Sequence, residues 1–154
     1  MQTIKLEVVN PNRPDVIVLI SELDAHLLSL YPRESTHLLD IDTLTQPNIR
    51  FVLASVESQA VGCGALRLQD GYAEIKRMYV RPQQRGTGVG YRILAYLEEI
   101  AGQLGFTVTR LETGVHQHDA MKLYERFNYV RRGPFGEYTN DPNSLCYEKR
   151  LVVE

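Results

Sequence analysis

The stretch VRPQQRGTGVGYRILAYLEEIAGQLG, residues 80–105, carries the pattern from which the fold is inferred. Three glycines alternate within residues 85–90, directly ahead of a segment whose apolar residues recur at helical spacing up to Leu104. The start of a helix carries free N–H groups and a partial positive charge, and both favour a bound phosphate. Because glycine lets a ligand approach the backbone closely, we expect a pyrophosphate-binding loop, followed by a packed helix that ends near Gly105.

Other phosphate-binding loops fit this stretch less well. A dinucleotide-binding G-x-G-x-x-G pattern would need a glycine at Tyr91, and a P-loop would need Gly-Lys followed by Ser or Thr. Arg85, with Arg81 and Arg92 nearby, could add charge-assisted contacts to a phosphate. Two alternatives stay open from this loop alone: a glycine-rich turn without a ligand, and a nucleotide-binding protein of another class.

Length and composition point to one globular domain, which we expect to comprise residues 1–154. Hydrophobic residues make up 44% and charged residues 23%, which is typical of a protein with a single packed core. A net charge of -2 argues against a general nucleic-acid-binding protein. No signal peptide or membrane-length apolar run is apparent. We therefore expect a cytoplasmic protein that binds neither nucleic acid nor membrane.

The cysteines and histidines do not form a metal-binding or nucleophile motif. Cys63 and Cys146 are far apart in the sequence and are expected to be buried, small hydrophobic residues. His116 and His118 precede a helical segment, but no third ligand has suitable spacing, so no metal site is predicted. The absence of a nucleophile motif around either cysteine also argues against a covalent enzyme intermediate.

Periodicity predicts the elements that surround the glycine loop. A first helix, with Asp15 as its cap, should run from Val16 to Leu30 and end before Pro32. The dipeptide Asp70–Gly71 indicates a hairpin between two strands. Expected strands lie at residues 3–9, 50–55, 60–69, 72–80 and 145–151, and a short second helix is expected within residues 32–49.

The strand before the glycine loop contains a break in its alternation. Ala73 and Ile75 place apolar side chains on one face, but Met78 and Val80 resume the pattern out of phase. Either both faces of the strand are buried, or one extra residue bulges out near residues 76–77. A bulge would bend the strand from its neighbour and open a cleft at its C-terminal end, where the glycine loop begins.

The motif RGTGVG, preceded by YVRP, together with the later AMKLYERFNYV, resembles the GNAT superfamily of acyl-CoA dependent N-acetyltransferases. The resemblance covers nearly the whole chain, and the tail from residue 134 to 151 is similar to a branch of small bacterial members. It implies an α/β three-layer sandwich with about four helices. The expected sheet is mixed and mostly antiparallel, with about seven strands and a split between the fourth strand and the fifth, residues 108–114.

The same resemblance implies acetyl-CoA as co-substrate, without a metal. The backbone of Met78, Tyr79 and Val80 would meet the pantetheine arm of the cofactor. Gln117 stands where the family often has an asparagine that contacts the cofactor, and Asn128 replaces the glycine that usually follows the last helix. The pyrophosphate would be held by the loop residues Arg85, Gly86, Thr87, Gly88, Val89 and Gly90.

The reaction that the resemblance implies needs a neutral amine, because an ammonium group cannot attack a thioester. Deprotonating a lysine-like amine at pH 7 costs about 4 to 5 kcal/mol, so a base is useful. Glu74 matches a position where several family members carry a catalytic glutamate, and it is the predicted base, directly or through water; the alternative is a solvent-facing strand residue. Tyr124 matches the family tyrosine that protonates the thiolate; alternatively it merely forms part of the apolar stripe of its helix.

The acceptor is expected to lie between two segments that overhang the sheet. Tyr31, Glu34, Ser35 and His37 belong to the connection after the first helix and are candidates for substrate contact, although loop variability alone could explain them.

Phe135 and Tyr138 in the tail loop are expected to wall the acceptor pocket from the other side, with aromatic packing on the sheet as the competing explanation. The sequence thus predicts an N-acetyltransferase that moves acetyl from acetyl-CoA to an amine of a small molecule or peptide in a ternary complex. The alternative is a non-catalytic acyl-CoA-binding or regulatory module of the same fold. A homodimer is an expectation from the fold.

Overall fold

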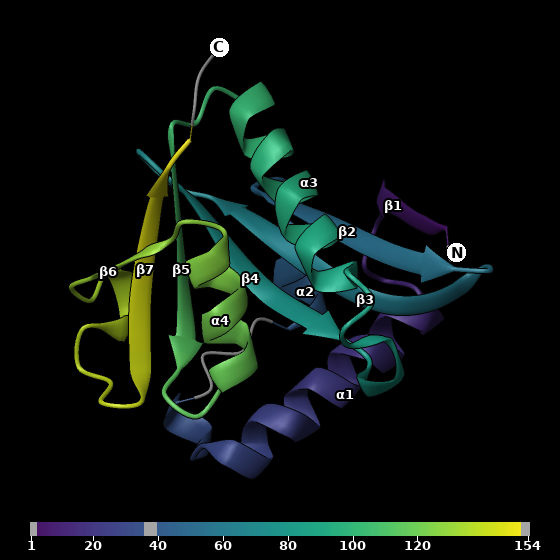
Figure 1. Ribbon diagram of the computed structural model, residues 1–154, viewed down its shortest axis with the longest axis horizontal. Coiled ribbons are helices and arrows are strands. Elements are labelled where there is room, and N and C mark those ends of the chain that lie inside the picture. The colour runs from purple at the N-terminus through teal and green to yellow at the C-terminus, as the bar shows by residue number, and fades with distance from the viewer. Residues whose placement is uncertain (1–2, 36–39, 152–154) are drawn as a thin grey trace.

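The computed structural model describes residues 3–35 and 40–151, apart from the side chain of Glu34. These residues form a seven-stranded sheet in the order β1-β2-β3-β4-β5-β7-β6, with four α-helices packed on its two faces (Figure 1). The strands are β1 (Ile4–Val8), β2 (Ile49–Val56), β3 (Gln59–Leu68), β4 (Ala73–Val80), β5 (Val108–Gly114), β6 (Val130–Arg132) and β7 (Ser144–Arg150). The helices are α1 (Pro14–Leu30), α2 (Ile41–Leu44), α3 (Val89–Gln103) and α4 (His118–Arg126), with short 3-10 turns η1 (Arg33–Ser35), η2 (Pro82–Gln84) and η3 (Gly136–Tyr138).

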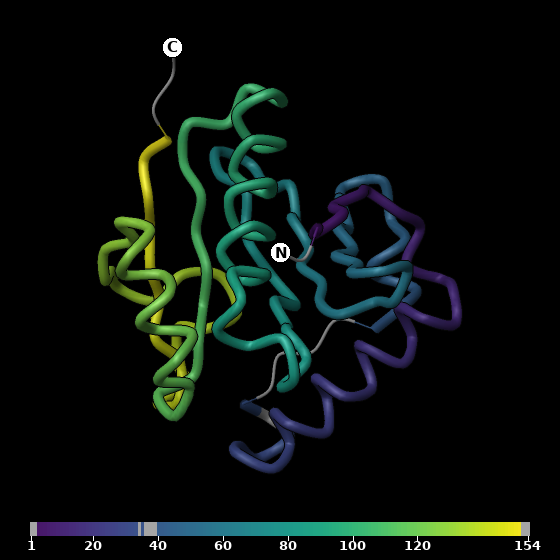
Figure 2. The backbone as a smooth tube through the Cα atoms, turned by 45° about the vertical axis from the view of Figure 1, so that its right-hand side comes forward, coloured from purple at the N-terminus to yellow at the C-terminus, as the bar shows by residue number. Residues whose placement is uncertain are grey.

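The sheet separates two apolar layers, as the sandwich architecture requires. On one face, α3 and α4 pack on the strands through residues such as Ile93, Leu97 and Tyr124. On the other face, α1 and α2 cover the sheet through residues such as Leu19 and Leu44. Figure 2 shows α3 and α1 on opposite sides of the central strands. A fully buried leucine or isoleucine contributes about 1.5 to 3 kcal/mol, so these two layers hold the sheet in place.

The alternation break in β4 is a β-bulge. Between the pairs Ala65↔Lys76 and Cys63↔Tyr79, β4 advances three residues while β3 advances two. Arg77 takes up the extra length with a positive φ of 58°, a conformation that is uncommon for a residue other than glycine. The bulge was one of two interpretations of the sequence pattern, and the register confirms it.

The bulge coincides with the split in the sheet. Strands β4 and β5 run parallel but pair only from Ala73 to Ile75, opposite Thr109 to Leu111. Beyond these three pairs the two strands diverge, as Figure 1 shows. All the other neighbouring strands in the described sheet pair antiparallel. The predicted mixed sheet with a split between the fourth and fifth strands is therefore confirmed.

The helix ends follow the local sequence, with one exception. Gly105 ends α3 with a φ of 90°, and Asn128 ends α4 with a φ of 70°; both conformations close the helix by backbone hydrogen bonds. The prediction that Asp15 caps α1 was wrong. The cap position is Arg13, because Pro14 takes the first helical position that proline favours, and Asp15 instead accepts hydrogen bonds from the Arg13 side chain. Among the described helices, none has the length and apolar character needed to cross a membrane.

Candidate active site

A small cavity of about 70 Å³ lies where β4 and β5 separate. Its walls come from α1, from β4 beyond the last parallel pair, from the end of β5 and from the start of α4. The wall formed by α1 is apolar, whereas the walls formed by the strands contain charged and polar groups. The lining residues include Leu23, Leu27, Tyr31, Ser35, Lys76, Arg77, Met78, Glu112, Gln117, Tyr124 and Tyr138.

The glycine loop leads from β4 into the first turn of α3. Gly86 and Gly88 have φ values of 82° and 92°, and Gly88 is the residue before the helix. The first backbone bond into the helix runs from the Arg92 N–H to the Gly88 carbonyl. Within the described residues, the N–H groups of Val89, Gly90 and Tyr91 have no backbone acceptor. These N–H groups and the exposed loop before them form the kind of surface that binds a phosphate.

Glycine is needed at two of these three positions. At Gly86 and Gly88 the positive φ would strain any other residue. At Gly90 the backbone is helical, and an added Cβ would make only ordinary contacts with Leu123 of α4 at 3.4 Å and with Val80 at 3.6 Å. The loop conformation thus depends on the first two glycines of the motif.

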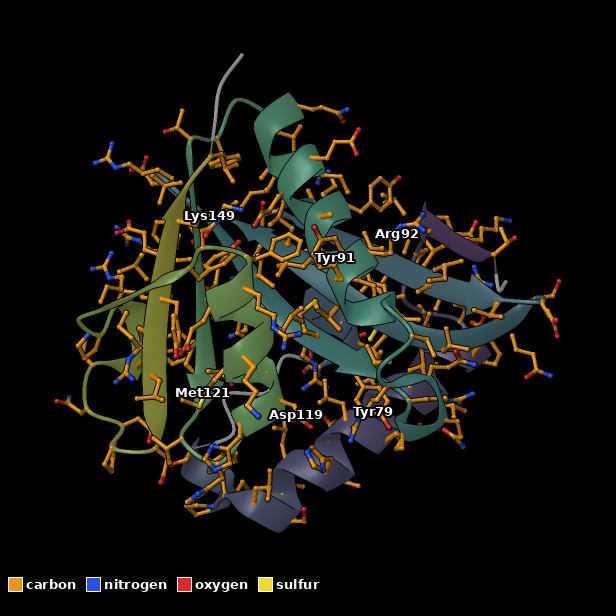
Figure 3. All side chains as sticks on the ribbon, viewed as in Figure 1. Tyr79, Tyr91, Arg92, Asp119, Met121 and Lys149 are labelled. Atoms are coloured by element: carbon orange, nitrogen blue, oxygen red, sulfur yellow. The ribbon has the colours of Figure 1, made fainter. Side chains whose placement is uncertain are left out.

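The three arginines near the loop have different partners. Arg81 is bound to Glu22 of α1 at 2.9 Å and to the Ala60 carbonyl at 3.0 Å, so it ties the loop to the core. Arg85 is exposed and donates to the Val80 carbonyl at 3.2 Å. Neither Arg85 nor Arg92 forms an ion pair with a described residue. Figure 3 shows Arg92 on the side of α3 toward β1 and Tyr91 on the side toward α4, where its ring lies against Phe127.

The residues predicted to meet the pantetheine arm end β4 along the split. Met78 lines the cavity, and both Met78 and Val80 pack toward α3. The Tyr79 side chain points to the opposite face, where its hydroxyl donates to Glu22 of α1 at 3.0 Å, as Figure 3 indicates. Beyond Ile75 this part of β4 has no paired neighbour on the β5 side, so its backbone borders the gap.

Tyr124 projects from α4 into the cavity and is only 5% exposed. Its ring lies beside the rings of Tyr129 and Tyr147. Burial raises the pKa of the Tyr124 phenol well above its usual value, and the nearby charge of Glu112 adds to this effect. Tyr124 therefore stays a neutral phenol, which can donate a proton or a hydrogen bond.

Glu74 lies on β4 within a buried polar cluster and does not line the cavity. Its side chain is 5% exposed, and it accepts a hydrogen bond of 2.6 Å from the hydroxyl of Tyr138. Lys76 lies between carboxylates: its Nζ is 3.7 Å from Glu74, 3.1 Å from Glu137 and 2.7 Å from the Tyr138 hydroxyl. Glu74 is thus buried, and Tyr138 stands between it and the cavity.

Glu112 is a carboxylate of the cavity wall that the sequence interpretation missed. It is half-buried, follows Leu111, the last β5 residue paired with β4, and accepts a hydrogen bond of 2.6 Å from Ser144. The only sequence signal for it is an acidic residue near the end of the predicted fifth strand. Recognising it would have required the register of β5 against β4.

The predicted acceptor residues near α1 are only partly described. Tyr31 is buried in the cavity wall, where its hydroxyl accepts a hydrogen bond of 2.9 Å from the His116 backbone and lies against Gly114. Ser35 also lines the cavity and donates to Asp141 at 3.0 Å. The side chain of Glu34 and the whole of His37 lie outside the described residues.

The two aromatic residues of the tail loop have different positions. Tyr138 lines the cavity, and its contact with an acceptor stays a prediction. Phe135 does not line it but packs with Tyr72, Tyr138 and Cys146 in a small separate cluster. For Phe135, the structure therefore fits the competing explanation of aromatic packing.

Gln117 is the residue before α4 and lines the cavity. Its side-chain carbonyl accepts a hydrogen bond of 2.9 Å from the Gly114 N–H, which closes the turn between β5 and α4. In the described part of the chain, no group of three or more acidic, cysteine or histidine side chains is placed to hold a metal ion. Cys63 and Cys146 are free and buried.

Comparisons with known proteins agree with this geometry. Residues 18–129 match the acetyltransferase (GNAT) family. The chain is 46% identical over 144 residues to an IAA acetyltransferase of Azospirillum brasilense, and the match covers 92% of this chain and 94% of the relative. A Klebsiella pneumoniae protein described as an acyl-CoA N-acyltransferase is 38% identical, with a TM-score of 0.81 over 99% of both chains.

A more distant structure shares the fold. PaiA N-acetyltransferase of Thermoplasma acidophilum, solved in complex with coenzyme A, has a TM-score of 0.73 at 17% identity and covers 97% of this chain and 99% of its own. A match to most of the chain and a relative of nearly equal length both indicate the same family. The chain therefore belongs to the GNAT family and is an acetyl-CoA dependent N-acetyltransferase.

Proposed function

We propose that this enzyme transfers acetyl from acetyl-CoA to the amine of a small molecule, by direct attack while both substrates are bound. The observation that carries the proposal is the cavity at the split between β4 and β5, into which Tyr124 projects. The cavity has room for a small acceptor. The two buried cysteines, which do not line the cavity, support direct transfer over a covalent intermediate.

Acetyl-CoA binding is assigned to the glycine loop and the unpaired end of β4. The N–H groups at the start of α3 would hold the pyrophosphate, with Arg85 adding positive charge from the loop. The backbone of residues 78–80 would hydrogen-bond the pantetheine arm across the gap in the sheet. Gln117 would contact the arm from the start of α4, where its side chain already lines the cavity.

Tyr124 is the proposed proton donor for the thiolate that leaves when the carbon–sulfur bond breaks. Its phenol is buried and its pKa is raised, so it is protonated at neutral pH. The same position would let it hydrogen-bond the thioester sulfur before transfer. This is the role that the family resemblance implies for the tyrosine.

Glu74 is the proposed base, acting through Tyr138. A direct contact with the amine is disfavoured, because Glu74 does not line the cavity and Tyr138 does. The acceptor ammonium would give its proton to the Tyr138 oxygen as Tyr138 passes its own proton to Glu74 across their hydrogen bond of 2.6 Å. Tyr138 stays neutral overall, Glu74 gains one proton, and the amine becomes a nucleophile. Glu112 would hold the amine at the cavity end of β5.

The direct test is thiol release from acetyl-CoA in the presence of a panel of small amines. A 46% identical relative carries the name IAA acetyltransferase, so IAA is tested in addition to the amines. Thermal shift with coenzyme A, acetyl-CoA, ATP and NAD is measured in parallel, because a ligand of the native state raises its apparent stability. Stabilisation by coenzyme A and acetyl-CoA with amine-dependent thiol release is the expected result.

Two outcomes would contradict the proposal in different ways. Stabilisation by acetyl-CoA without release of thiol for any amine would indicate the non-catalytic binding module. Stabilisation by ATP or NAD but not by coenzyme A would indicate a nucleotide-binding role for the glycine loop.

A further inference from the structure

Arg77 is a buried cation whose hydrogen-bonding capacity is largely unused. Its side chain is 3% exposed, and the residue lines the cavity at the bulge of β4. One guanidinium nitrogen, Nη2, binds Asp24 of α1. The other two, Nε and Nη1, are buried and have no hydrogen-bond partner among the described residues. An unsatisfied buried donor costs about 1 to 3 kcal/mol, and more when it is charged.

The backbone at Arg77 adds to this cost. Its φ of 58° belongs to the left-handed region that a residue with a long side chain rarely adopts. Such strained positions persist where the surrounding structure holds them and are concentrated at ligand sites. The bulge thus places Arg77 among the residues that line the cavity, and it does so at a free-energy cost in both backbone conformation and hydrogen bonding.

The other charges of the cavity wall already have partners. The Lys76 ammonium is held by Glu137, Tyr138 and the nearby Glu74. Glu112 accepts from Ser144 and lies at the β5 side of the split. Arg77 therefore differs from Lys76 in having two buried donors without a partner among the described residues. Glu112 of β5 and Arg77 of β4 both belong to the residues that line the cavity.

We propose that the acceptor is a small amino acid, or a closely similar compound that carries both an amine and a carboxylate, and that Arg77 binds its carboxylate. This inference rests on the proposed function, because it names the substrate class of the same cavity. The amine would lie at Glu112, whose charge acts on Tyr124, and the carboxylate would accept hydrogen bonds from Arg77. Leu23 and Leu27 of α1, which also line the cavity, would contact the apolar part of the acceptor.

The first experiment measures kcat/KM for matched sets of acceptors. Each set contains an amino acid, its amide and the amine without the carboxyl group, for example L-leucine, L-leucinamide and 3-methylbutylamine. Sets based on L-phenylalanine and L-methionine vary the side chain. Because charge-assisted hydrogen bonds to a carboxylate are strong, we expect kcat/KM for the amino acid to exceed kcat/KM for its amide by about 10- to 100-fold. The amide is a stringent control, since its amine has the lower pKa and is more often neutral at pH 7.

The second experiment measures binding without turnover. N-acetyl-L-leucine and N-acetyl-L-leucinamide are titrated into the enzyme complexed with coenzyme A, and the heat of binding is recorded. The sets based on L-phenylalanine and L-methionine are treated in the same way. We expect the carboxylate to bind more tightly by about 10-fold or more. This result would support the inference even if acetyl transfer itself failed, so the two proposals can fail separately.

The variant Arg77→Gln tests the residue, with Arg150→Gln as its matched control. Arg150 is exposed and pairs with Val108, at the end of β5 opposite to the cavity. In Arg77→Gln, the ratio of kcat/KM for the amino acid to kcat/KM for its amide should fall toward 1, chiefly because the KM for the amino acid rises. In Arg150→Gln the same ratio should keep its wild-type value. Arg77→Lys retains the charge and checks the result if the glutamine variant fails to fold.

Several outcomes would overturn the inference. One is a wild-type enzyme that acetylates amides and simple amines as well as amino acids, or better. Another is a carboxylate preference that survives unchanged in Arg77→Gln. A third is the absence of carboxylate-dependent binding in every set, which would mean that water alone satisfies the Arg77 donors.

Discussion

Tyr124 combines deep burial with a position in the cavity wall, and this combination predicts the effect of removing its hydroxyl. Tyr124→Phe should lower kcat by about 100-fold or more, because proton transfer by a positioned group contributes 10²- to 10⁴-fold. The KM for acetyl-CoA should change little, since the ring is kept. Steady-state kinetics by thiol release measures both values.

Tyr129→Phe is the matched control for this variant. Its hydroxyl bonds Thr109 at 2.8 Å in the core and does not line the cavity. Losing it should lower stability by about 1 kcal/mol and leave kcat near the wild-type value. If Tyr124→Phe turned over as fast as Tyr129→Phe, Tyr124 would not be the proton donor.

The two carboxylates near the cavity should respond differently to neutralisation. Glu74→Gln removes the proposed base and should lower kcat by about 10²- to 10⁴-fold. Glu112→Gln weakens the proposed contact with the amine and should mainly raise the KM for the acceptor. Kinetics with the acceptor varied at saturating acetyl-CoA separates the two effects. The reverse pattern would make Glu112 the base and Glu74 a structural residue.

At the scale of elements, the start of α3 depends on a left-handed residue. Gly88→Ala places a Cβ at a φ of 92°, which costs on the order of 1 to 2 kcal/mol. We expect lower stability and weaker binding of coenzyme A, because the loop must change its conformation and redirect its N–H groups. Chemical denaturation and calorimetric titration with coenzyme A measure the two effects.

A glycine within α3 provides the control. Gly102 is helical, and an added Cβ there would have nothing within 4 Å. Gly102→Ala should therefore stabilise the protein by about 0.5 to 1 kcal/mol without changing coenzyme A affinity. Equal effects of the two substitutions on affinity would exclude a specific role for the loop conformation.

At the scale of the whole molecule, buried acidic groups predict how stability depends on pH. Burial raises the pKa of Tyr124, Tyr129 and Tyr138 in the folded state, and it raises the pKa of Cys63 to about 12. Each group binds its proton more tightly in the folded chain than in the unfolded one. The contribution of the tyrosines is complete below their unfolded pKa of about 10, and that of Cys63 below about 8.5. Each contribution is lost as the pH rises through the folded value of the group.

The melting temperature should accordingly fall steeply above about pH 10. In Tyr129→Phe one of these groups is gone, so its melting temperature should fall less steeply over the same range, although it starts lower. Thermal unfolding between pH 8 and 11.5 tests this. Parallel curves for the two proteins would mean that Tyr129 does not contribute to alkaline unfolding.

Much of the architecture follows from short-range patterns. The hairpin at Gly71, the end of α3 at Gly105 and the left-handed Asn128 were all predictable, because the conformations of these residues limit what the chain can do locally. The same reasoning failed at Asp15, because Pro14, directly before it, takes the first helical position and makes Arg13 the cap residue. Local signals locate elements well and assign their first residue less well.

The sequence by itself determined the glycine loop, the packed helix after it, the family and the position of the break in β4, because each depends on neighbours along the chain. Only the tertiary structure decided which carboxylate faces the cavity. Glu74 lies behind Tyr138 and Glu112 lines the wall. The physical reason is that the three-pair register of β4 and β5, together with the bulge at Arg77, sets which side chains meet across the split. Contacts between strands so far apart in sequence leave no local pattern.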